Sequence, residues 1–183
     1  MFDYLRFEED LKKTVEETMR NKLDRKDDVY IMSIQYFPEI TTLVRLICNT
    51  HSYLNEQADV SKEGEYLYYK YCEEEWEIWD EFDELSKRLQ DYSEEVDRKF
   101  ELMEGDDIDE QYEMEYKTHV GKMIEIGKSV AKWFRTTEIF KQYPNLLVNF
   151  YMREFFSSQE DVEIFKEINE GSDCTEIEKF YFG

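Results

Sequence analysis

Carboxylate side chains crowd into one short stretch of the chain, where they could pair with basic groups of another molecule. They are Glu73, Glu74, Glu75, Asp80, Glu81, Asp83 and Glu84, and Trp76 lies among them. Carboxylates bind Lys and Arg through strong charge-assisted hydrogen bonds, and tryptophan is enriched among the residues that dominate interfaces. We therefore expect a partner-binding site here, with Trp76 as its desolvated anchor. The simpler alternatives stay open, namely a solvated acidic face and core positions for Trp76 and Trp79.

The charge of the whole chain is concentrated in the same region. The 183 residues include 23 Lys or Arg and 45 Asp or Glu, which give a formal net charge of −22. Residues 61–116 hold 22 acidic and six basic residues, so they carry −16 and the other 127 residues carry only −6. A charge of this sign argues against direct binding to nucleic acid or to anionic membranes, and it favours a basic protein partner.

The other chemistry-bearing residues form no recognisable catalytic or metal-binding motif. Cys48 lies three residues before His51, but the second histidine, His119, is remote and no second ligand pair completes a metal site. The sequence has no EF-hand loop, no His-Glu-x-x-His motif and no glycine-rich phosphate loop. We therefore predict a protein that is not an enzyme and that needs no metal or cofactor. Three scattered cysteines form no disulfide framework and indicate a reducing cytoplasm.

Aromatic residues indicate a folded protein in spite of the high charge. Disordered acidic chains lack aromatic residues, whereas this sequence has 13 Phe, 14 Tyr and 3 Trp. The length fits one domain that can fold without a metal or a disulfide. No apolar run predicts a membrane span, and the first residues lack the apolar segment of a signal peptide. We predict a single cytoplasmic domain over residues 1–183.

The hydrophobic pattern predicts the elements that must position the acidic stretch. Apolar residues recur at helical spacing over 7–23, 82–103, 112–134 and 162–168. Runs of β-branched and aromatic residues over 29–37, 40–48, 66–71 and 145–151 predict four strands, the first two as a hairpin. A short helix over 53–58 and a mobile acidic loop near 104–111 are also expected. This order predicts an α+β fold with a mostly antiparallel sheet of about four or more strands and with helices packed on one face.

Three stretches of the chain form a further pattern. The first leads from the amphipathic helix through Val29–Ile34 to Leu43–Thr50, the second is Tyr69–Trp76, and the third joins Leu147–Phe150 to the helix that ends at Ile168–Asn169. These stretches resemble a bacterial domain family of unknown function that occurs beside polymorphic toxins and is classed with their immunity proteins. The resemblance implies a small cytoplasmic protein that neutralises one toxin, such as a nuclease with a basic cleft. A DNA mimic of the anti-restriction type and a small regulatory protein are the alternatives.

Overall fold

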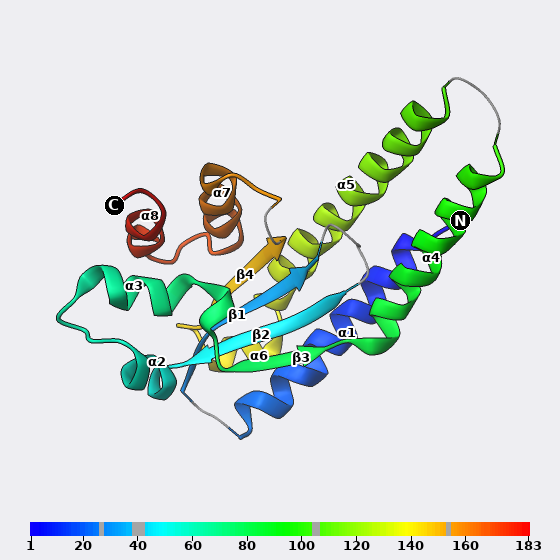
Figure 1. Cartoon of the computed structure of the whole chain (residues 1–183). Coiled ribbons are helices and arrows are strands. Elements are labelled where there is room, and N and C mark those ends of the chain that lie inside the picture. Colours follow the sequence, from blue (N-terminus) through cyan, green and yellow to red (C-terminus); the bar gives the residue numbers. More distant parts are fainter. Residues whose placement is uncertain (26–27, 38–42, 104–106, 153–154) are drawn as a thin grey trace.

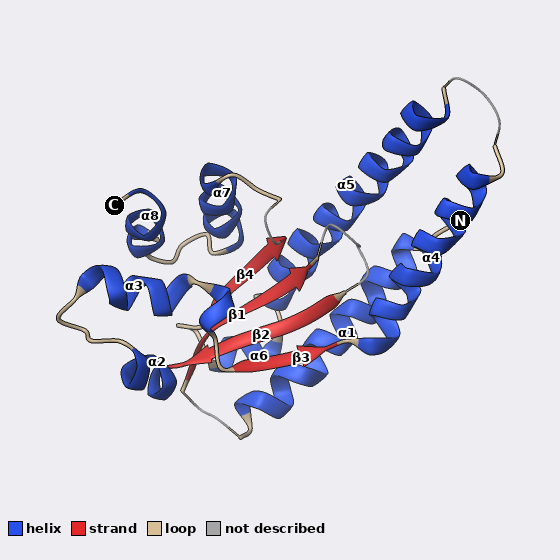
Figure 2. Cartoon of the chain, in the orientation of Figure 1, coloured by secondary structure: helices blue, strands red, loops and turns tan. Residues whose placement is uncertain are grey.

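The computed structural model describes residues 1–25, 28–37, 43–103, 107–152 and 155–183. A four-stranded sheet lies at its centre, between two layers of helices (Figures 1 and 2). The strands are β1 (Val29–Tyr36), β2 (Val44–Thr50), β3 (Ile78–Glu81) and β4 (Leu147–Met152). The helices are α1 (Tyr4–Leu23), α2 (His51–Gln57), α3 (Glu63–Tyr71), α4 (Asp83–Glu101), α5 (Ile108–Phe134), α6 (Glu138–Gln142), α7 (Ser158–Ile168) and α8 (Thr175–Phe182), and a single 3-10 turn, η1, spans Glu73–Glu75. The predicted α+β fold is confirmed.

The sheet is mixed in its strand directions. Its order is β3-β2-β1-β4, in which β2 is antiparallel to both β1 and β3 while β4 runs parallel to β1. The predicted hairpin is present as the antiparallel pair of β1 and β2, although its turn at residues 38–42 lies outside the described residues. Because β4 runs parallel to β1, the chain must return to the end of the sheet where β1 begins before it enters β4. Helix α5 makes this return (Figure 1). The sheet is thus antiparallel in two of its three strand pairs.

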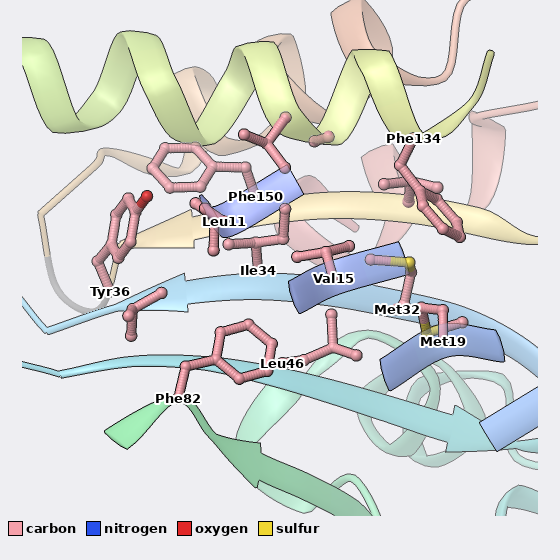
Figure 3. Packing of buried hydrophobic residues seen from close by; sticks show 14 of the residues in the cluster. Leu11, Val15, Met19, Met32, Ile34, Tyr36, Leu46, Phe82, Phe134 and Phe150 are labelled. Carbon is pink, nitrogen blue, oxygen red and sulfur yellow. The ribbon is translucent and has the colours of Figure 1, made fainter. Parts of the chain in front are cut away.

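The larger core lies on one face of the sheet, which we call the first face. Met32, Ile34 and Leu46 point from β1 and β2 toward α1 (Figure 3), and α4, α5 and α6 complete this layer. The stripe on α1 consists of residues four positions apart, all of them buried: Phe7, Leu11, Val15, Met19 and Leu23. This spacing places the five side chains on one side of the helix, as the sequence pattern predicts.

Helices also cover the opposite face of the sheet, which we call the second face. Here α2, α3, α7 and α8 surround a separate apolar cluster that includes Ile31, Ile47 and Phe165. Every residue of β1 and β2 is buried, so neither side of these strands is left open to water. The expectation of helices on one face only is therefore wrong, because both sides of the two central strands are packed against other parts of the chain.

Two segments differ locally from their predicted structure. Residues 66–71, predicted as a strand, belong to α3, where Leu67 and Tyr71 are buried four positions apart on one side of a helix. The third strand is instead β3, which has four residues and pairs with β2. Within the predicted mobile loop near 104–111, residues 104–106 lie outside the described residues, and α5 already begins at Ile108. The loop is thus shorter at its C-terminal end than predicted.

Helices α4 and α5 form a long antiparallel hairpin that extends past the sheet (Figure 1). Both helices are amphipathic, and α4 buries Leu85, Leu89 and Val96. Near the far end of the hairpin, Leu102 and Met114 are exposed to solvent. Within the described ranges, none of the helices combines the length and the apolar character that crossing a membrane requires.

Candidate partner-binding site at the edge of the sheet

The residues predicted to bind a partner separate into a buried pair and a group that is half-buried or exposed. Glu73 and Trp76 are buried over the second face of the sheet, with 5% and 3% of their surface exposed. Glu74 is exposed, and Glu75 accepts a hydrogen bond of 2.9 Å from the Tyr68 hydroxyl. The other four residues lie where β3 ends and α4 begins: Asp80, Glu81, Asp83 and Glu84. The acidic stretch is therefore divided by η1 and β3 and does not form one surface.

Glu73 is held in the interior by the outer strand β4. Its Oε1 accepts a hydrogen bond of 2.6 Å from Nδ2 of Asn149. Burial raises the pKa of Glu73 to about 8, and the nearby carboxylate of Asp161 contributes to the shift. Burial also raises the pKa of Asp161 itself to about 6. A buried carboxyl that keeps its proton at neutral pH cannot steer a basic partner, so Glu73 does not contribute to an acidic docking surface.

Trp79, and not Trp76, is the exposed tryptophan of this region. Trp76 belongs to the apolar cluster of the second face. Trp79 is 50% exposed, its Nε1 donates a hydrogen bond of 2.6 Å to the Trp76 carbonyl oxygen, and its ring centroid lies 4.2 Å from the Arg45 guanidinium. The prediction of Trp76 as the anchor is wrong, because its indole is enclosed by the protein's own core. The sequence leaves core positions open for both tryptophans, and only the packing distinguishes the two.

A groove lies beside the edge strand, between α1, the end of β3 and the start of α4. It has a volume of ≈ 570 Å³. Six acidic and three basic side chains line this groove: Asp10, Glu17, Asp80, Glu81, Asp83, Glu84, Arg6, Lys13 and Arg88. We call it the acidic groove. Four residues of the predicted site belong to it, namely Asp80, Glu81, Asp83 and Glu84, so the structure brings these four together.

Asp10 and Glu17 are groove residues that the sequence analysis did not find. They lie on α1, about 60 to 70 positions before β3, and only the packing of α1 beneath the sheet brings them to the groove. Their spacing of seven residues places them on one side of the helix, which is the only signal the sequence holds. That signal does not say which other element the helix side will face, so sequence reasoning had no means of joining them to the acidic stretch.

Ion pairs occupy some of the charges in the acidic groove and leave others available. Asp10 lies 2.6 Å from Nη1 of Arg88 and 3.7 Å from Nε of Arg6. Asp80 Oδ2 lies 2.7 Å from Nζ of Lys22 on α1. The remaining three acids at the end of β3 form no ion pair with any described residue: Glu81, Asp83 and Glu84.

The helix dipole gives a structural reason for two of these free carboxylates. Asp83 and Glu84 occupy the first turn of α4, where negative charge is stabilised by the unsatisfied N–H groups of the helix start. Glu81 lies on β3 and has no such role. Its side chain is exposed at the edge of the sheet, opposite Arg45 of β2 in the strand register.

Residues with metal-binding or nucleophilic chemistry stay apart from one another. No three His, Cys, Asp or Glu side chains of the described chain are grouped so as to hold a metal ion. Cys48 is buried in the core of the first face, and this burial raises the pKa of its thiol. His51 begins α2, and the centroid of its ring lies 4.8 Å from that of the Tyr30 ring. His119 is buried in α5, its pKa is lowered by burial to about 4, and its Nδ1 lies 2.9 Å from the Tyr4 hydroxyl. The Cys48 thiol and the two imidazoles therefore lie in three separate environments.

Comparisons with known proteins identify a family. A family model described as a domain of unknown function, DUF4303, matches residues 8–170. No curated protein and no solved structure matches the chain. The matched range contains all four strands and every residue of the acidic groove except Arg6. The fold and the candidate site thus lie within the family domain.

Proposed function

The chain belongs to the DUF4303 family of unknown function, and we propose that it is a binding protein whose acidic groove receives a basic protein partner. The proposal rests on one observation: Glu81, Asp83 and Glu84 have no ion-pair partner among the described residues, and Glu81 lies on the same edge strand as the half-exposed Trp79. Free charges around an exposed aromatic ring are typical of interfaces, because the ring supplies buried area while the charges select and orient the partner.

We further propose that the protein is a cytoplasmic immunity protein, which binds one toxin and blocks it. Two features support this reading, namely the resemblance carried by the three sequence stretches and the excess of carboxylates in the groove. A toxin that attacks nucleic acid needs a basic cleft for its substrate. An acidic inhibitor is attracted to such a cleft over a long range, and once bound it occupies the path of the phosphates.

A DNA mimic is the second candidate, and the arrangement of charges favours it less. A mimic presents carboxylates along one face at the spacing of phosphates, without basic residues between them. In the acidic groove, Arg6, Lys13 and Arg88 lie among the acids, and Asp10 and Asp80 are held in ion pairs. The acidic groove is compact and carries charges of both signs. It therefore resembles a site for one basic protein more than it resembles a row of DNA phosphates.

Affinity capture from the native cells tests the binding function with three forms of the protein. The first is the wild type. The groove variant carries Glu81→Lys, Asp83→Lys and Glu84→Lys. The control variant carries Glu125→Lys, Glu163→Lys and Glu170→Lys, which reverse three exposed carboxylates outside the groove.

Because both triple variants change the net charge equally, a difference between them reports the site and not the bulk charge. We expect the wild type and the control variant to retain the same basic protein, and the groove variant to lose it while keeping a cooperative thermal transition. Equal loss from both variants would mean that only total charge matters, and the groove would have to be abandoned as the site.

Co-expression separates immunity from other kinds of binding. The captured partner, expressed alone in a bacterial host, is expected to stop growth. The wild-type protein should restore growth and the groove variant should not. A partner without toxicity would exclude the immunity function but would leave the binding function intact.

A further inference from the structure

The two edges of the sheet differ in whether another strand can join them. We propose that the partner docks by adding a strand to β3, and that this strand is an extended segment with Lys or Arg at alternate positions. The inference rests on the proposed function, because it specifies how a basic partner would sit on the acidic groove and what its docking segment must contain.

The edge at β4 is closed by a side chain of the protein itself. Asn169 is buried, its Oδ1 accepts a hydrogen bond of 3.0 Å from the Val148 N–H, and its Nδ2 donates one of 2.6 Å to the Val148 carbonyl oxygen. The Asn169 amide thus imitates the main chain of a neighbouring strand. An incoming strand at this edge would have to displace two buried hydrogen bonds.

The edge at β3 has main-chain groups that point away from the sheet. The Phe82 N–H donates a hydrogen bond of 3.0 Å to the Val44 carbonyl oxygen, so the main-chain groups of Phe82 face β2. This contact fixes which residues of β3 direct their N–H and C=O groups toward β2 and which direct them away from the sheet. In an antiparallel pair these directions alternate from residue to residue. Asp80 therefore faces β2, while the N–H and C=O groups of Trp79 and Glu81 face outward. No other strand of the described chain pairs with this side of β3.

The side chains around β3 define the chemistry of the added strand. Ile78 and Asp80 lie on the first face, and Trp79 and Glu81 lie on the second, because strand side chains alternate. On the first face, an added strand passes over the acidic groove, where Asp83 and Glu84 are free. Every second residue of the added strand would meet these acids, so Lys or Arg fits there. The residues between them would meet the exposed ring of Trp79.

The same charges argue against a second copy of this chain as the occupant. Two β3 strands placed side by side would bring the Glu81 carboxylates and the two acidic grooves together, and like charges on neighbouring strands are destabilising. Edge acids of this kind prevent sheets of identical chains from joining. They exclude acidic strands and favour basic ones, so the edge discriminates by charge.

A short, capped peptide of alternating Lys and Val is the probe for this mode of docking. We expect it to protect the Trp79 and Glu81 amides from hydrogen exchange by about tenfold or more, since each would enter a main-chain hydrogen bond. The Asp80 amide, which already faces β2, should change little. Exchange followed residue by residue with NMR distinguishes these amides.

A matched pair of variants separates main-chain docking from charge attraction. Glu81→Gln removes the carboxylate and keeps the outward N–H, whereas Glu81→Pro removes both and is tolerated where an edge N–H faces solvent. Strand addition predicts that the Pro variant binds the peptide about fivefold to tenfold more weakly than the Gln variant, because it lacks one main-chain hydrogen bond. Thermal unfolding of the Pro variant verifies that it is folded.

These experiments distinguish a failure of strand addition from a failure of the proposed basic-partner function. If the peptide binds but leaves the Trp79 and Glu81 amides unprotected, or if the Gln and Pro variants bind it equally, strand addition is overturned. The basic-partner function would then still be decided by the capture experiment. If the wild-type protein does not bind the alternating peptide at all, the proposed docking segment is likewise overturned.

Discussion

At the scale of single residues, Glu73 makes the stability of the protein depend on pH. Its pKa is raised from the ordinary 4.5 to about 8 by burial. As the pH rises from 4.5 to about 8, the unfolded chain releases this proton while the folded chain keeps it, so the free energy of unfolding falls. Below pH 4.5 both states hold the proton and the effect disappears.

The variant Glu73→Gln tests this titration, because it keeps a neutral group beside Asn149. We expect the variant to be more stable than the wild type by a few kcal/mol at pH 8, on the order of 1.4 kcal/mol for each unit of pKa shift. The advantage should shrink steadily toward pH 5. Urea unfolding across this range measures it. Parallel pH profiles would show that Glu73 is not buried as a neutral acid.

The two tryptophans of the acidic stretch are expected to respond differently to truncation. Trp76→Ala removes a ring that is 97% enclosed, since only 3% is exposed, and should lower the free energy of unfolding by roughly 3–5 kcal/mol. Trp79→Ala should lower it by about 1 kcal/mol or less, since half of its ring already contacts water. In the complex with the basic partner, Trp79→Ala should raise the dissociation rate. Equal stabilities of the two variants would contradict the assignment of core and surface.

At the scale of elements, α5 can approach β4 closely only because Gly127 has no side chain. A Cβ at Gly127 would lie 2.2 Å from Cε2 of Phe150, whereas a Cβ at Gly121 on the same helix meets nothing within 4 Å. We expect Gly127→Ala to destabilise the protein by about 1–3 kcal/mol through overpacking. Gly121→Ala should stabilise it by about 0.5–1 kcal/mol through helix propensity. Thermal unfolding of the pair decides, and changes of the same sign would contradict this packing.

The closed edge of β4 gives a second prediction for an element. Asn169→Ala removes the side chain that bonds to both main-chain groups of Val148. We expect a loss of roughly 1–3 kcal/mol in the free energy of unfolding, because buried polar groups lose their partners. The exposed edge should also promote self-association, which light scattering measures. A variant that stays monomeric and fully stable would show that Asn169 does not protect the edge.

At the scale of the whole molecule, the uneven distribution of charge should govern how quickly the partner is found. The net charge of −22 attracts a basic protein over a distance that salt shortens. We expect the association rate to fall steeply with added salt, and the groove triple variant to lose more of its rate than the control triple variant. Stopped-flow or surface-based kinetics at two salt concentrations measure both. An association rate independent of salt would contradict electrostatic attraction to the groove.

Several features of the fold could be predicted from the sequence because neighbouring residues determine them. The stripe from Phe7 to Leu23 repeats every four residues, and a helix is the structure that collects such a stripe on one side. The β-branched and aromatic runs over 29–37 and 40–48 likewise predict the strands that the structure has at 29–36 and 44–50. The concentration of acids between residues 61 and 116 can be counted directly. Each of these depends on local spacing or composition alone.

The identity of the candidate site depended on contacts between distant parts of the chain. Residues 66–71 have the composition of a strand, yet Leu67 and Tyr71 meet the second core only as a helix. Trp76 is buried because it joins the apolar cluster of the second face, whereas Trp79 lies on the edge strand and is half exposed. The groove exists because residues of α1 come to lie beside the end of β3 and the start of α4. Local periodicity states which side of an element is apolar. It does not say which element packs against that side, in which register the strands pair, or which strand is left at the edge of the sheet. These features depend on the tertiary fold, because the contacts that stabilise them join residues far apart in the sequence.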